Sequence, residues 1–159
     1  MTDFGHQRGL TLVELLLALG ISALIASTLG TAIHQFIMTS ERGNDSLRAL
    51  HDVQNAGFWL TLDGERAEGT SLVDGAPPVQ SMTLSWTSGG QAHTSTFSLS
   101  GAALRREHNG TITTVARHVA SAQFSLAGRV ITATMTSTPA GRWGVSEQAM
   151  YKIWLRPTD

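Results

Sequence analysis

The carboxylate of Glu14 is the chemical group whose position in this sequence most needs an explanation. It is the only charged side chain between Leu10 and Ile33, where 16 of 24 residues are apolar. An acidic side chain in so apolar a helix persists where a partner offsets the cost of its desolvation. Glu14 therefore predicts a partner of opposite charge, unless the side chain lies at a membrane interface and reaches water.

The residues that precede Glu14 form a motif. The sequence Arg8-Gly9-Leu10-Thr11-Leu12-Val13-Glu14-Leu15 resembles the class III signal of type IV prepilins and type II secretion pseudopilins. The resemblance implies cleavage after Gly9 by a prepilin peptidase, followed by N-methylation of Leu10. It also implies that the Glu14 carboxylate meets the N-terminal amine of a neighbouring subunit during assembly.

The apolar stretch itself is long enough to cross a membrane. Its 24 residues, at about 1.5 Å each, exceed a hydrocarbon core of about 30 Å. Arg8 in the short preceding segment predicts a cytoplasmic N-terminus, a single pass through the inner membrane and an exported C-terminal part. A cleaved secretory signal peptide is one alternative, although its apolar core usually has only about 7 to 15 residues. An uncleaved anchor on a soluble domain is another.

No catalytic constellation is visible in the remaining sequence, so we expect a protein that is not an enzyme and has no cofactor or small-molecule substrate. The six histidines form no HExxH motif, no serine lies in Gly-x-Ser-x-Gly, and cysteine is absent. Asp63, Glu65 and Asp74 carry oxygen ligands suited to calcium, but their spacing matches no calcium loop, and we favour a solvated connector. His108 and His118 are expected on solvated strand faces.

One local cluster of basic residues raises the alternative of DNA binding. Arg105, Arg106, Arg117 and His118 could contact phosphates if the chain served a DNA-uptake pilus. Beyond residue 33, however, ten basic side chains balance ten acidic ones. Because this balance predicts weak, salt-sensitive binding at most, we expect ordinary surface charge and disfavour nucleic acid as a partner.

The segment from residue 137 to 148 is the predicted partner-contacting surface. It contains Arg142 and Trp143 close to Pro139, Gly141 and Gly144, and Arg and Trp are both enriched at binding hot spots. As an alternative to ligand binding, packing in the core or between helix and sheet is expected for Phe58 and all four tryptophans, Trp59, Trp86, Trp143 and Trp154.

Two periodicities organise the chain outside the membrane. Apolar residues recur at steps of three and four as far as residue 62, which predicts a helix over 10–62 with a candidate weak point at Gly43-Asn44; they are Phe36, Ile37, Leu47, Leu50, Val53, Gly57 and Leu60. From Val79 the period becomes two, with turns at 88–91, Asn109-Gly110 and 127–128. We expect about six antiparallel strands in one or two sheets.

The predicted architecture is therefore α+β. A leader over residues 1–9 precedes an N-terminal helix over 10–62, membrane-spanning over 10–33, which packs on an antiparallel β domain over 63–159. The layout of residues 104–124 is similar to J-type minor pseudopilins and PilW-like minor pilins. Together the resemblances imply a minor pilin or pseudopilin that assembles with sister subunits in a type II secretion pseudopilus or a type IV pilus, including a DNA-uptake pilus. An anchored extracytoplasmic binding domain that does not assemble is the alternative from another class.

Overall fold

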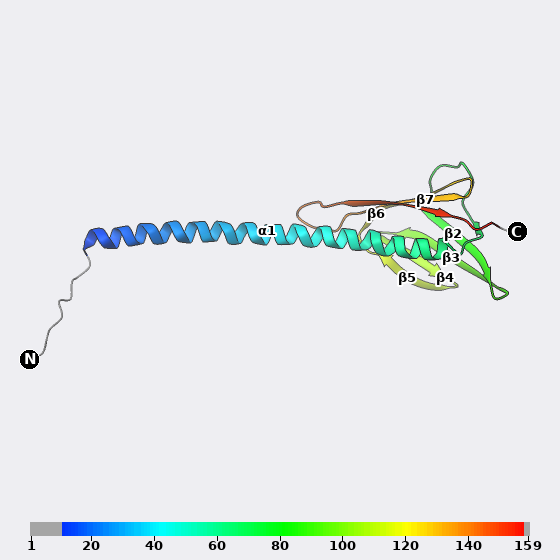
Figure 1. Cartoon of the computed structure of the whole chain (residues 1–159), viewed down its shortest axis with the longest axis horizontal. Helices are drawn as coiled ribbons and strands as arrows, with labels where there is room; N and C mark the ends of the chain where they lie inside the picture. Colours follow the sequence, from blue (N-terminus) through cyan, green and yellow to red (C-terminus); the bar gives the residue numbers. More distant parts are fainter. Residues whose placement is uncertain (1–10, 158–159) are drawn as a thin grey trace, which may run out of the picture. The chain divides into compact units, whose positions relative to one another are not determined.

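The computed structural model describes residues 11–157, which form one helix and eight strands. Figure 1 shows the long helix followed by the strands. This arrangement confirms the predicted α+β class, in which a long N-terminal helix packs against antiparallel sheets. The elements are α1 (Leu12–Gly64), β1 (Gly69–Thr70), β2 (Ser81–Ser88), β3 (Gln91–Ser100), β4 (Ala103–His108), β5 (Thr111–Ala116), β6 (Val119–Ala127), β7 (Val130–Ser137) and β8 (Glu147–Trp154).

The chain divides into two compact units, the first ending at Glu41 and the second beginning at Arg42. In its described part, the first unit consists of the N-terminal portion of α1. The second contains the C-terminal portion of α1 and all the strands. The helix is unbroken at Gly43 and Asn44, the weak point indicated by the sequence.

The strands of the second unit form two antiparallel sheets. One has the order β1-β2-β3-β4-β5, and the other has the order β6-β7-β8. The predicted hairpin turn at Asn109-Gly110 joins β4 to β5, and both residues have positive φ angles, 48° and 84°. Such angles at both central residues define the tight turn that this dipeptide favours. Short bridges between Asp74 and Leu126 and between Val79 and Phe124 connect the β1–β2 loop to the second sheet.

The helix face that packs on the sheets agrees with the predicted one only in part: Val53, Gly57 and Leu60 are buried, as expected. Leu47 and Leu50 are 64% and 41% exposed, so the prediction that they belong to the packed face is wrong. The other buried residues of α1 are small or acidic: Asp45, Ala49, Asp52, Ala56, Asp63 and Gly64. Small side chains allow the helix and sheets to approach closely, and hydrogen bonds to Asp52 and Asp63 compensate the burial of these two acids.

The aromatic residues are divided between core and surface. Trp86 is buried and Trp59 packs against the core, as predicted. Phe58 and Trp154 are 59% and 65% exposed, which corrects the expectation that they would be packed. Each directly adjoins an inward-facing residue, and adjacent side chains point in different directions on a helix and to opposite faces on a strand.

Candidate functional site

The N-terminus of α1 is closed by a reciprocal pair of hydrogen bonds between Thr11 and Glu14. The Glu14 carboxylate accepts bonds from the Thr11 backbone N–H at 2.9 Å and from its hydroxyl at 3.0 Å. The Thr11 hydroxyl oxygen in turn accepts a bond from the Glu14 N–H at 3.3 Å. This is a capping box, which satisfies N–H groups that a helix leaves free in its first turn. Glu14 therefore has a partner within its own chain.

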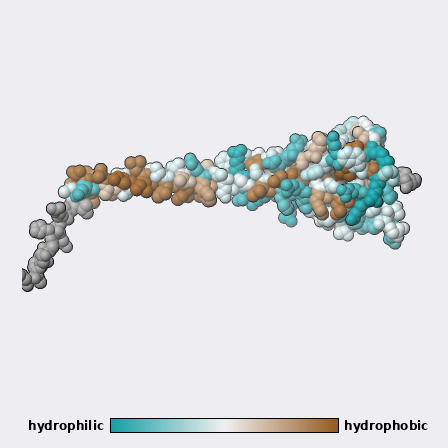
Figure 2. Space-filling model, in the orientation of Figure 1, coloured by the Kyte–Doolittle hydropathy of each residue, from teal (hydrophilic) through white to brown (hydrophobic). Residues whose placement is uncertain are grey.

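The helix that follows this cap presents apolar side chains that no other described part of the chain covers. Leu12, Leu17 and Leu24 are among many exposed large apolar residues before Ile33, and Figure 2 shows the hydrophobic colouring along this stretch. An 18-residue window of α1 has a mean hydropathy of 2.2 and no buried residue. By length and composition, this helix can cross a membrane, consistent with a single membrane anchor.

Asp52 joins α1 to the segment between β5 and β6. Its carboxylate accepts hydrogen bonds from the backbone N–H groups of Arg117 and His118, at 3.0 and 3.1 Å, and from the hydroxyl of Ser137 at 3.2 Å. The His118 ring nitrogen Nδ1 lies 2.8 Å away and donates a fourth bond, because a carboxylate can only accept. Burial raises the pKa of the Asp52 carboxyl, but these Arg117 and His118 contacts outweigh burial and hold that pKa below its ordinary value of 3.8.

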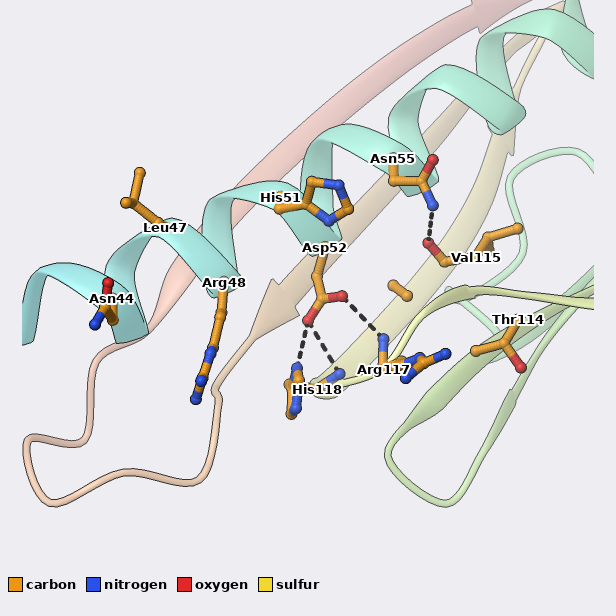
Figure 3. A pocket seen from close by; sticks show the side chains of 11 residues that line it. Asn44, Leu47, Arg48, His51, Asp52, Asn55, Thr114, Val115, Arg117 and His118 are labelled. Atoms are coloured by element: carbon orange, nitrogen blue, oxygen red, sulfur yellow. Dashed lines mark hydrogen bonds and ion pairs between the residues drawn. The ribbon is translucent and has the colours of Figure 1, made fainter. Parts of the chain in front are cut away.

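An open groove of about 710 Å³ lies beside this junction, between α1 and residues 114–118. Figure 3 shows Arg48 and His51 on its helical wall and Arg117 on the opposite wall. The Asn55 side-chain amide on the helical wall donates a hydrogen bond to the Val115 carbonyl on the opposite wall, at 2.8 Å. The Asp52 carboxylate in this groove already accepts four hydrogen bonds, so it is poorly placed to act as a general base. The remaining basic and amide side chains of the groove are suited to binding.

Asp63 lies in the core, which corrects its placement in a solvated connector. It is fully buried at the end of α1 and accepts hydrogen bonds from Arg106 on β4 and Ser95 on β3. Asp74 accepts a bond from the Gly128 N–H at 2.7 Å. Within residues 11–157, no three His, Cys, Asp or Glu side chains gather in a way that could hold a metal ion.

The predicted basic cluster does not act as one surface. The Arg106 guanidinium is buried against Asp63, and the His118 ring is bonded to Asp52. Of these four residues, only Arg105 and Arg117 have exposed side chains that form no ion pair with a described carboxylate. His108 stacks on Trp86, so it and His118 engage different partners.

Comparison with known proteins bears on the N-terminal segment. Residues 5–30 match the family described as the prokaryotic N-terminal methylation motif. The chain carries a pilin-type prepilin signal. This motif supports the pilin and pseudopilin family, whose members are generally structural proteins that prepilin peptidase processes and that assemble with other pilin subunits. No curated protein and no solved structure matches the chain.

The prepilin signal includes Gly9 and Leu10, the predicted cleavage and methylation residues. Both lie outside residues 11–157, so the structure does not describe them. Thr11 and Glu14, on the helix side of the predicted cleavage point, are described. The Thr-x-x-Glu spacing is a known capping signal, and it was available in the sequence as a second explanation for Glu14.

The predicted partner-contacting residues lie in the loop between β7 and β8. Arg142 and Trp143 are both exposed there. The preceding Gly141 lies directly against the Asp45 carboxylate on α1, where a Cβ atom at position 141 would overlap it. The loop therefore rests on the helix through Gly141 and leaves the two neighbouring side chains accessible.

The sequence interpretation missed the role of Asp52 and assigned Asp63 to a solvated connector. With Asp45, they recur at separations of seven and eleven residues, which place side chains on one face of a helix. That regular spacing of acids was the available signal of a polar, packed face. Nothing in the local sequence identified Arg106 or His118 as their partners.

Proposed function

We propose that this protein is a minor pilin or pseudopilin, a structural subunit of a type II secretion pseudopilus or a type IV pilus. The observation that carries the proposal is the prepilin signal joined directly to an apolar helix that residues 11–157 leave uncovered. Such a helix needs lipid before assembly and the helices of sister subunits after it. The J-type or PilW-like subtype is our preferred placement within this proposal.

We infer a single pass through the inner membrane, with a cytoplasmic N-terminus and a periplasmic or extracellular C-terminal domain. Arg8 on the short N-terminal side supports this orientation, since basic residues are retained in the cytoplasm. Prepilin peptidase would cleave after Gly9 on the cytoplasmic side, and Leu10 would then be N-methylated. The uncleaved helix would stay in the protein and hold the subunit in the membrane until assembly.

In assembly, we propose that the Glu14 carboxylate pairs with the N-terminal ammonium of Leu10 in a neighbouring subunit. The capping box competes with this role, because the same carboxylate bonds Thr11. Glu14→Gln distinguishes the charge pair from the capping role, since Gln also serves in a capping box but carries no charge. Thr11→Ala is the matched variant, which removes the cap hydroxyl and keeps the charge.

The test is co-purification of tagged full-length variants with sister subunits, after confirming that each is processed. The charge-pairing role predicts that Glu14→Gln and Glu14→Val are processed but enter the complex poorly, while Thr11→Ala enters nearly normally. Normal incorporation of Glu14→Gln would contradict the charge pair and favour a capping role alone.

A further inference from the structure

A second pocket, of about 480 Å³, lies just beyond the C-terminal end of α1. Four segments meet there: the turn after α1, the tip of the β2–β3 hairpin, the end of β4 and the segment after β8. The lining residues are Arg66, Trp86, Thr87, Ser88, His93, His108 and Arg156. They include two guanidinium groups, two imidazoles and two hydroxyls, but no carboxylate.

Backbone hydrogen bonds bring the two arginines to the same pocket. The Arg66 N–H bonds the Asp63 carbonyl at 3.2 Å in the turn that ends α1. The Arg156 N–H bonds the Ala67 carbonyl at 2.9 Å, which ties the segment after β8 to that turn. In Figure 1 the end of β8 lies near the end of α1, in agreement with this bond. Neither arginine side chain forms an ion pair within residues 11–157.

The hydrogen bonds of Asn109 define the proton position on His93. The Asn109 carbonyl oxygen Oδ1 accepts a bond from the Thr94 N–H at 3.0 Å, which fixes the orientation of the amide. Its Nδ2 therefore donates to Nδ1 of His93, at 2.9 Å. Because Nδ1 accepts, the neutral His93 ring carries its proton on Nε2 and has a hydrogen-bond donor to offer.

The neutral His108 ring also carries its proton on Nε2, for a different reason. Its Nδ1 is buried and has no hydrogen-bond partner among the described residues. A buried N–H without an acceptor is costly, so the neutral ring carries its proton on Nε2. The two imidazoles stack with Trp86, with ring centroids 5.7 and 5.6 Å from its own. This stacking fixes both rings in the pocket wall.

Glu68, an acid beside the pocket, is already engaged. The Glu68 carboxylate accepts a bond from the Thr87 N–H at 3.2 Å. It lines an adjoining hollow that shares Trp86, Thr87 and His93 with this pocket, but it is not among the residues that line the pocket itself. Among the described residues, the pocket wall thus presents mainly hydrogen-bond donors, with two guanidinium groups that form no ion pair.

We propose that the pocket of Arg66, His93, His108 and Arg156 binds a phosphate group. Guanidinium forks match phosphate oxygens bidentately, and charge-assisted bonds of this kind are strong. A phosphate monoester has three terminal oxygens to accept from two arginines and further donors, whereas a carboxylate has only two. The phosphate can belong to a small molecule or to nucleic acid, and the binding experiment separates these sources.

The experiment is calorimetric titration of the full chain in maltoside micelles, which contain no phosphate. The probes are inorganic phosphate and a short single-stranded DNA with or without a 5′-phosphate, with acetate as the carboxylate control. We expect saturable phosphate binding that Arg66→Gln and Arg156→Gln each weaken about tenfold or more, as for a lost charge-assisted bond. Arg105→Gln, which removes an exposed charge on β4, should leave it unchanged.

The two sources give different patterns. Binding of inorganic phosphate and of 5′-phosphorylated DNA alone supports a monoester ligand. Equal binding of both DNAs, lost in the Arg66 and Arg156 variants, supports a nucleic-acid backbone. The proposal is overturned if no probe binds, if acetate binds as well as phosphate, or if Arg105→Gln weakens binding as much as Arg66→Gln. Circular dichroism of every variant verifies folding.

Discussion

The Asp63 carboxylate, at the end of α1, accepts two hydrogen bonds from the Arg106 guanidinium on β4, at 2.6 and 2.8 Å. Both side chains are largely buried, and the Ser95 hydroxyl donates a third bond to the carboxylate. The guanidinium also lies over the Trp59 ring, 4.6 Å from its centroid. This network fixes the end of the helix on the five-stranded sheet.

Removing one member of this pair should destabilise the domain strongly. Asp63→Ala leaves the Arg106 charge buried without its partner, and we expect the free energy of unfolding to fall by about 3–5 kcal/mol. Urea unfolding of the full chain, followed by tryptophan fluorescence, measures the change. Glu65→Ala, an exposed acid two residues away, is the control and should stay within about 0.5 kcal/mol of the parent.

Replacing both members should restore most of the loss. In Asp63→Leu/Arg106→Met no charge is left buried, and well-packed apolar replacements of buried ion pairs are often neutral or stabilising. A double variant as unstable as Asp63→Ala would show that the geometry of the pair, rather than its charge balance, holds the helix.

Gly57 is required by the close approach of Tyr151 to α1. A Cβ atom at position 57 would overlap the Tyr151 ring, whose hydroxyl donates to the Val53 carbonyl at 2.8 Å. Gly57→Ala should therefore displace the ring and destabilise the domain by about 1–3 kcal/mol. Gly43→Ala, where the added methyl meets nothing, should instead stabilise by up to about 1 kcal/mol because Ala favours the helix. The same urea experiment compares them, and equal effects would contradict the contact.

Asp52 should make stability depend on pH in the acidic range. Its pKa is lowered in the folded chain, so its contribution is complete above the ordinary value of 3.8 and is lost as pH falls through the lower, folded pKa. The free-energy difference between the parent and Asp52→Asn should consequently shrink below about pH 4. Unfolding measured from pH 6 to pH 2 tests this, and a constant difference would rule out the linkage.

The exposed Trp143 tests the predicted contact surface. If the β7–β8 loop binds sister subunits, Trp143→Ala should reduce their co-purification, because 36% of the residue is exposed to a partner. Its unfolding transition is measured alongside, to separate a lost contact from a lost fold. Trp154→Ala removes an exposed tryptophan from β8 and is the matched control. Undiminished co-purification of the Trp143 variant would exclude this residue from the interface.

Features encoded by short-range patterns could be predicted from the sequence. The β4–β5 hairpin follows from Asn109-Gly110 because only the local backbone decides that turn. The helix and the alternating strands follow from their hydrophobic periods, and the class of fold follows from their order.

Features that depend on long-range pairing could not be predicted. Asp63 and Arg106 are 43 residues apart, and Asp52 and His118 are 66 residues apart. The buried face of α1 is the one on which small residues such as Ala56 allow the sheets to come close to the helix. Because the apolar side chains Leu47 and Leu50 suggested another face, the acids of the true face were not recognised as packed.

The mature N-terminus of the purified protein, determined by mass spectrometry, tests the central claim most directly. A pilin or pseudopilin subunit predicts a chain that begins at Leu10 with one N-methyl group and retains the whole of α1. A chain that begins at Met1, or one cleaved after the apolar stretch near Ala32, would contradict processing as a prepilin.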